Sequence, residues 1–92
     1  MAKLYKTDGT IISVEPKNGK DFKLAELKEL VGGYIEIVGL VDNMFMVVNE
    51  EGKLNGLDYN TNATSVLEGY AQCPSNDYIV GDALVCGRNQ IL

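Results

Sequence analysis

The chain has 92 residues, of which 46% are hydrophobic and 23% are charged. These proportions indicate a single folded domain and exclude a disordered, collagen-like or repeat protein. Thirteen acidic against eight basic residues give a net charge of −5, and there is no histidine. The negative charge argues against general binding to nucleic acid, and the composition lacks the commonest general base and zinc ligand.

The first predicted element is a β-hairpin made of residues 4–6 and 11–15. Thr7-Asp8-Gly9-Thr10 lies between the two strands, and Asp-Gly accepts the positive φ angles of a tight two-residue turn. Pro16 ends the second strand because proline has no N–H to donate to a sheet. Residues 17–20 then form a solvated loop.

A helix is predicted over residues 24–31. Apolar residues recur there at intervals of three and four, and they place one face toward a core: Leu24, Leu27, Leu30 and Val31. Either Asp21 or Lys23, the latter with Glu26 three residues later, can cap the helix, and Phe22 can staple its first turn. Gly32-Gly33 favours a left-handed ending.

A second hairpin is predicted from residues 34–41 and 44–49, because both runs are rich in β-branched and aromatic residues. Asp42 and Asn43 between them tolerate turn geometry. Met44, Phe45 and Met46 are apolar on both faces of the strand. This pattern is typical of a central strand covered on both sides, or of an edge that pairs with another chain.

The remaining sequence predicts an extended segment over residues 53–60, a short helix over 63–70 capped by Thr61 or Asn62, a loop over 73–77, and a last strand over 78–86. The tail from Gly87 is expected to be loosely ordered. The resulting order is β-β-α-β-β-α-β. We therefore expect a single α+β domain over residues 1–92, with an antiparallel or mixed sheet of about five strands and two helices packed on one of its faces.

No catalytic, metal or cofactor site is predicted. Cys73 and Cys86 form no C-x-x-C motif and are expected to be reduced thiols, with Cys86 in the core and Cys73 in a loop. Asp58, Asn60 and Asn62 alternate as in the start of a calcium loop, but Ala63 stands where such a loop needs glycine. Turn formation and helix capping explain these residues better.

Polar residues in the least regular part of the chain suggest a binding site for a small ligand, lined by Asn49, Asn60, Thr64 and Asp82. Asp82 is unusual because it interrupts an apolar strand, where an acid must be paired, hydrogen-bonded or turned into a pocket. Either it accepts backbone N–H groups near Gly81 and holds a bend, or it contacts a ligand.

Three segments, VGGYIEIVGL, MVVNEEGKLNGLDYNTNAT and DYIVGDALVCG, occur in an order and spacing that resemble a family of bacteria, phages and mobile elements, domain of unknown function 3846. The likeness covers roughly residues 12–87 and is most specific in Asn49-Glu50-Glu51-Gly52 and Gly81-Asp82. Lys23 departs from the Ser or Thr expected before the first helix. The resemblance implies a gut bacterium or phage cytoplasm as the setting, and it implies no reaction and no catalytic residues.

No apolar run approaches the roughly 18 residues of a membrane span, and no signal peptide is recognised, so we expect a cytoplasmic protein without membrane contact. The leading hypothesis is a non-enzymatic accessory protein of a phage or mobile element. It would bind another protein, or a second copy of itself, through Met44, Phe45 and Met46. The alternative is a module that binds or sequesters a small ligand. An acidic decoy of nucleic acid, or an unrecognised enzyme, ranks third.

Overall fold

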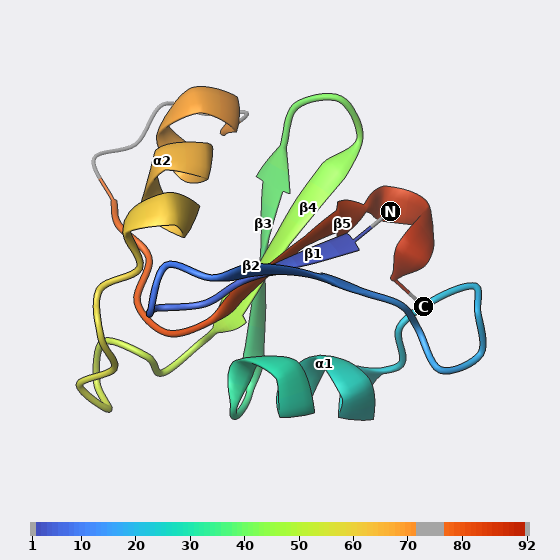
Figure 1. The fold of residues 1–92 in the computed structure, drawn as a ribbon, viewed down its shortest axis with the longest axis horizontal. Helices are drawn as coiled ribbons and strands as arrows, with labels where there is room; N and C mark the ends of the chain where they lie inside the picture. Colours follow the sequence, from blue (N-terminus) through green and yellow to red (C-terminus); the bar gives the residue numbers. More distant parts are fainter. Residues whose placement is uncertain (1, 72–76, 92) are drawn as a thin grey trace.

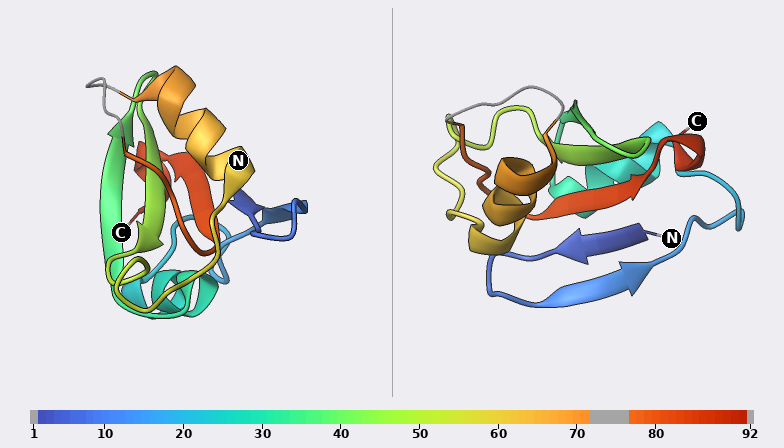
Figure 2. Two further views of the ribbon diagram at one scale, coloured as in Figure 1. Left: turned by 90° about the vertical axis from the view of Figure 1, so that its left-hand side faces the viewer. Right: turned by 90° about the horizontal axis from the view of Figure 1, so that it is seen from above.

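The computed structural model describes residues 2–71 and 77–91. In these residues the chain forms a five-stranded antiparallel sheet, two α-helices and a short 3-10 helix (Figures 1 and 2). In chain order the elements are β1 (Ala2–Tyr5), β2 (Ile11–Val14), α1 (Leu24–Val31), β3 (Ile35–Leu40), β4 (Met44–Asn49), α2 (Thr61–Tyr70), β5 (Ala83–Gly87) and η1 (Arg88–Gln90). The predicted α+β class and element order are confirmed. Neither α-helix has the length and apolar character needed to cross a membrane.

The strand order across the sheet is β2-β1-β5-β4-β3. The two hairpins predicted from the sequence, β1–β2 and β3–β4, are both present, and β5 joins them by pairing with β1 on one side and β4 on the other. The strand with apolar residues on both faces, β4, is therefore a central strand. β2 and β3 form the two edges.

The helices lie on opposite faces of the sheet, so the expectation of one covered face is wrong. Successive residues of a strand point to opposite faces. Val47 packs in the cluster that contains the α1 residues Leu27 and Val31, whereas its neighbour Val48 packs in the cluster that contains Leu67 of α2. Each helix therefore covers its own hydrophobic core, and Figure 1 shows α1 and α2 at separate sides of the strands.

The turns of the two hairpins differ. In the first, Lys6 donates to Thr10 O (2.9 Å), Gly9 donates to Lys6 O (3.1 Å), and Gly9 has φ 92°. This is a longer loop with one left-handed residue, so the predicted two-residue turn is wrong. In the second hairpin, Asp42 and Asn43 both have positive φ (61° and 58°), as their turn propensity predicted.

The ends of α1 resolve the choice of cap. Lys23 is the N-cap residue, and its backbone N–H donates to the Glu26 carboxylate (3.1 Å), which also accepts from the Lys17 N–H (2.9 Å). These backbone hydrogen bonds lower the pKa of Glu26, the bond from Lys17 most. Phe22 is buried in the same core as Leu27, as expected for a staple, and the helix ends at Gly32 with φ 81°.

The second half of the chain departs from the expected boundaries. Residues 50–56 form consecutive turns rather than an extended segment, and Tyr59 pairs with Val80 as an isolated bridge. The last strand begins at Ala83, because the chain bends at Gly81 (φ 76°), where a Cβ atom would lie 2.8 Å from Leu57 Cδ1. The predicted bend is confirmed, but residues 78–82 lie outside the strand.

The segment after β5 is ordered, contrary to expectation. Residues 88–90 form η1, the Gln90 side chain accepts from the Gly87 N–H (3.0 Å), and Phe22 donates to Gln90 O (2.6 Å). Ile91 forms a parallel bridge with Phe22. No periodic pattern predicts the two contacts of Phe22, because they join residues that lie far apart in the sequence.

Candidate functional site

Asn60 is fully buried and serves as the N-cap of α2, a role that the sequence assigned to Thr61 or Asn62. Its Oδ1 accepts from the Ala63 N–H (3.0 Å), and its Nδ2 donates to the carbonyls of Tyr5 and Gly81 (2.8 Å each). All three contacts are with backbone groups. The side chain therefore joins the end of β1, the bend before β5 and the start of α2, and it offers no exposed surface to a ligand.

Thr64 and Asp82 also bind the backbone. The buried Thr64 hydroxyl accepts from the Ile79 N–H (2.9 Å), which fixes the segment before β5 against α2. Asp82 Oδ1 accepts from the Thr7 N–H (3.0 Å), and Asp82 Oδ2 lies 3.6 Å from the Lys6 ammonium. Asp82 thus fastens the β1–β2 turn to the bend, although its donor belongs to that turn and not to the neighbourhood of Gly81.

Asn49 lies elsewhere, next to α1. Its Nδ2 donates to Val31 O (3.2 Å) near the end of the helix, and its Oδ1 accepts from the Glu51 N–H (2.8 Å). The four residues predicted to line one ligand pocket therefore do not form one. Each is engaged with backbone groups, and Asn60 and Thr64 are interior residues.

The predicted interface of Met44, Phe45 and Met46 also requires correction. Met46 has no exposed surface and belongs to the core under α2. Met44 is half-buried against that core, and half-buried Phe45 lies beneath the Arg88 guanidinium, 5.7 Å from the ring centroid. The side chains on both faces of β4 are apolar because both faces of this strand are covered. Met46 is therefore not available to a partner.

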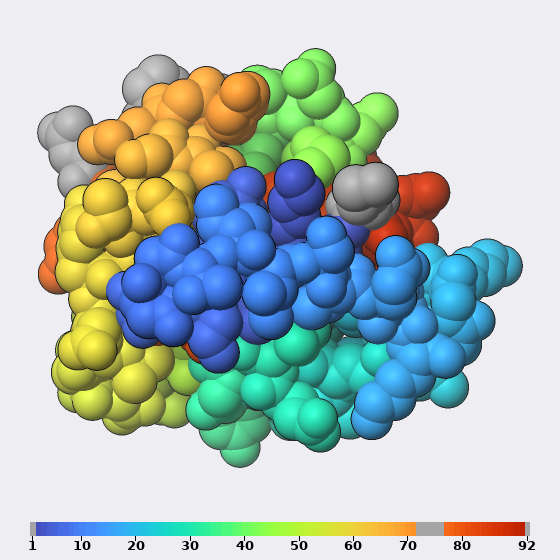
Figure 3. Space-filling view, in the orientation of Figure 1, coloured from blue at the N-terminus to red at the C-terminus, as the bar shows by residue number. Residues whose placement is uncertain are grey.

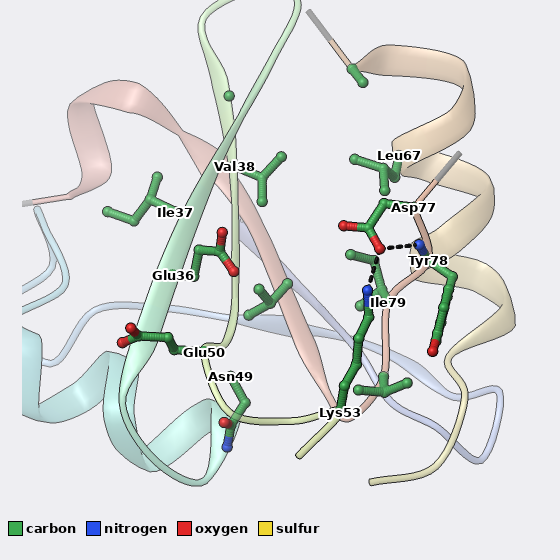
Figure 4. A pocket seen from close by; sticks show the side chains of 14 residues that line it. Glu36, Ile37, Val38, Asn49, Glu50, Lys53, Leu67, Asp77, Tyr78 and Ile79 are labelled. Atoms are coloured by element: carbon green, nitrogen blue, oxygen red, sulfur yellow. Dashed lines mark hydrogen bonds and ion pairs between the residues drawn. The ribbon is translucent and has the colours of Figure 1, made fainter. Parts of the chain in front are cut away.

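A cleft of about 460 Å³ lies between β3 and the α2 side of the molecule, closed on the far side by residues 77–80. Figure 4 shows the side chains that line it, and we call it the β3–α2 cleft. Its apolar lining comes from both sides: Val38, Val48, Leu67 and Ile79. Figure 3 shows the front of the molecule, where the residues of β1 and β2 lie across the surface between those of the two helices.

Charged groups line the same cleft. Glu36 projects from β3 into it, whereas the Lys53 ammonium forms a hydrogen bond and ion pair with Asp77 on the other side and lies 4.1 Å above the Tyr78 ring centroid (Figure 4). Glu50 also lines the cleft. Three carboxylates against one ammonium make the cleft acidic.

The ion pair shifts the pKa values of both partners. The pKa of Lys53 is raised, first by its hydrogen bond to Asp77, and the charge of Glu36 contributes to the same shift. The pKa of Asp77 is lowered, first by the hydrogen bond from Lys53 and then by that from the Tyr78 N–H. Both groups are charged at neutral pH. The ion pair is exposed, so it adds little stability.

No local pattern in the sequence predicts this cleft. Glu36 interrupts an apolar run at a strand position, which is a local sign of an exposed face, but nothing local places it near Asp77 and Tyr78, about forty residues later. That proximity depends on the chain crossing back over the α2 face of the sheet.

The described residues provide little for covalent chemistry. Burial raises the pKa of the Cys86 thiol to about 11, so it stays protonated and shielded from solvent, as expected of a core residue. Cys73 lies outside the described residues. Between residues 2 and 71 and between 77 and 91, no group of three Cys, Asp or Glu side chains is arranged to hold a metal ion.

One comparison with known proteins decides the family. The family described as Domain of unknown function (DUF3846) matches residues 6–91, nearly the whole chain. The chain belongs to this family. The match includes every strand and helix that lines the β3–α2 cleft, so the cleft is built from the domain itself. Neither a curated protein nor a solved structure matches the chain.

Proposed function

We propose that this chain is a non-enzymatic accessory protein that binds another protein, and that it holds an extended segment of its partner along β3 and in the β3–α2 cleft. The observation that carries the proposal is the cleft, which combines an apolar lining with a charged rim beside an edge strand. The buried Cys86 thiol and the lack of histidine favour binding over catalysis.

The edge strand favours an extended partner. β3 is the outermost strand on its side of the sheet, and in the described residues its outer edge pairs only at Leu40, which bridges to Ala71. An extended peptide can add to such an edge through backbone hydrogen bonds, and alternate side chains then enter neighbouring pockets. Ile37 of β3 is 43% exposed and extends the apolar surface at this edge.

The setting that we propose for this binding is the cytoplasm of a bacterium that carries a phage or mobile element, including gut bacteria. It rests on the resemblance noted from the sequence. The proposed surface replaces Met44, Phe45 and Met46, because Met46 belongs to the core.

A library of random twelve-residue peptides, displayed and selected on the immobilised full chain, tests the proposal. We expect enriched peptides whose binding is lost in Glu36→Trp, because the indole fills the cleft from an exposed strand position. The control is Glu29→Trp, an exposed position on α1. Selection of no peptide, or equal binding to both variants, would contradict the proposal.

A small-ligand module is the second candidate, favoured by the volume of the cleft, which lies in the range of small-molecule sites. The ligand site of this candidate is the cleft, which does not include the predicted residues Asn60 and Thr64. Native mass spectrometry of the chain purified from bacterial cytosol tests it: a retained ligand that Glu36→Trp abolishes supports it, and a bare mass speaks against it.

A further inference from the structure

The β3–α2 cleft already holds a cation. Lys53 reaches from the turns after β4 and places its ammonium against the Asp77 carboxylate and over the Tyr78 ring. Tyr59 lies beside Tyr78, with ring centroids 5.9 Å apart, and both rings are about half exposed. Carboxylate and aromatic faces together are the usual environment of a bound ammonium or guanidinium group. The position of Lys53 therefore shows that this cleft accommodates a cationic side chain.

Glu36 also lines the cleft, and the Lys53 ammonium pairs with Asp77 and not with Glu36. Glu36 projects into the cleft from β3 and is exposed, and within the described residues its carboxylate has no hydrogen bond or ion pair. Val38 and Val48 lie on the same face of the sheet, because Glu36 pairs with Val48 in the ladder and Val38 follows two residues later. The cleft therefore places the exposed Glu36 carboxylate beside an apolar surface, made by half-buried Val38 and buried Val48.

From this arrangement we infer that the partner segment places a lysine or arginine side chain in the β3–α2 cleft, with its cation at Glu36 and its aliphatic stem against Val38 and Val48. The inference rests on the proposed function and specifies its ligand. A long basic side chain fits both parts of the site, because its methylene groups bury against apolar surface while its charge pairs with the carboxylate. The acidic lining, with Glu50 nearby, would repel an acidic segment.

The test uses the peptides selected on the full chain. We expect a common Lys or Arg among them, and replacing it by Gln should weaken binding about tenfold, the effect of losing one charge-assisted hydrogen bond. Glu36→Gln should weaken the basic peptide to a similar degree, and Glu36→Lys should reverse the preference, so that a peptide with Glu at that position binds better than the original. Glu29→Lys changes the net charge equally on α1 and should leave the preference intact.

The outcomes separate the inference from the proposed function. Peptides that lose binding in Glu36→Trp but share no basic residue, or that bind Glu36→Lys without a reversed preference, overturn the inference and leave the binding cleft standing. A failure to select any peptide contradicts the proposed function itself. Circular dichroism of each variant confirms that its fold is unchanged, as expected at an exposed position.

Discussion

Asn60 connects three separate parts of the chain through one buried side chain. A buried carbonyl that loses its donor costs about 1–3 kcal/mol, and the loss of an N-cap costs about 0.5–2 kcal/mol. We expect Asn60→Ala to lower the free energy of unfolding by roughly 3 kcal/mol, measured by urea denaturation.

Asn62 is the matched control for that measurement. It is an asparagine at the same end of α2, but its Nδ2 makes a single exposed contact with Gly9 O (3.3 Å). Asn62→Ala should change stability by less than about 0.5 kcal/mol. Equal losses of stability in the two variants would show that the Asn60 side chain does not hold these three parts of the chain together.

The ionisation of Cys86 depends on the fold. Burial raises the pKa of its thiol from 9.0 to about 11. In a Cys73→Ser background, we expect a thiol reagent to label the folded chain at pH 8 only as fast as it unfolds, and to label it rapidly in urea. Rapid labelling of the folded chain would contradict the burial of Cys86.

The same shift gives stability a pH dependence with a definite sign. The folded chain keeps the proton up to about pH 11, whereas the unfolded chain releases it above about pH 9. The contribution of Cys86 is therefore complete below pH 9 and is lost as pH rises through 11, by at most about 1.4 kcal/mol per unit. Comparison with Cys86→Ala across this range isolates the thiol from other groups that titrate there.

Between elements, Asp82 attaches the β1–β2 turn to the bend that precedes β5. The hydrogen bond from the Thr7 N–H matters more than the ion pair, because Lys6 is 39% exposed. We expect Asp82→Asn, which keeps an acceptor for Thr7, to lose less than about 0.5 kcal/mol, and Asp82→Ala to lose about 1–2 kcal/mol.

Hydrogen exchange of the Thr7 amide supplies a local measurement for the same pair of variants. Exchange should accelerate in Asp82→Ala and stay slow in Asp82→Asn. An unchanged rate in Asp82→Ala would mean that the turn is held by other contacts.

Local patterns were sufficient to predict most elements. The two hairpins, α1 and its staple follow from turn residues and apolar spacing within about fifteen residues of one another. The sequence predicts the cap of α2 one or two residues late, because Asn60, Thr61 and Asn62 are all suitable caps in isolation. Burial against Tyr5 and Gly81 selects Asn60, and only the folded chain brings these groups together.

The predicted site residues needed correction for the same reason. Apolar residues on both faces of β4 are equally compatible with an interface and with a sheet covered on both sides, and the choice depends on where α2 packs. The acid and aromatic groups of the β3–α2 cleft, Glu36, Asp77 and Tyr78, come from segments far apart in the sequence. Local patterns in one sequence do not reveal which distant segments lie close together in the fold.

At the scale of the whole molecule, the sheet separates two hydrophobic cores. Val31 and Val47 belong to the core under α1, and Val48 belongs to the core under α2. Each substitution to Ala should cost roughly 1–3 kcal/mol. We expect the costs of Val31→Ala and Val48→Ala to add within about 0.5 kcal/mol, because the two side chains pack in separate cores on opposite faces of the sheet.

The pair Val31→Ala and Val47→Ala is the control, since both residues lie in one core and the double variant can relax around a shared cavity. Its coupling energy should exceed that of the first pair in urea denaturation. A larger coupling between Val31 and Val48 would argue against two separate cores.

The position of β5 has a consequence for biosynthesis. The strand that joins the two hairpins is made after both of them, because residues 83–87 follow the other four strands of this sheet. Until the ribosome releases them, the nascent polypeptide carries two hairpins whose inner edges, β1 and β4, have no strand between them. The five-stranded sheet therefore forms only after residues 83–87 have left the ribosome, and contacts distant in sequence dominate this step, which favours slow folding.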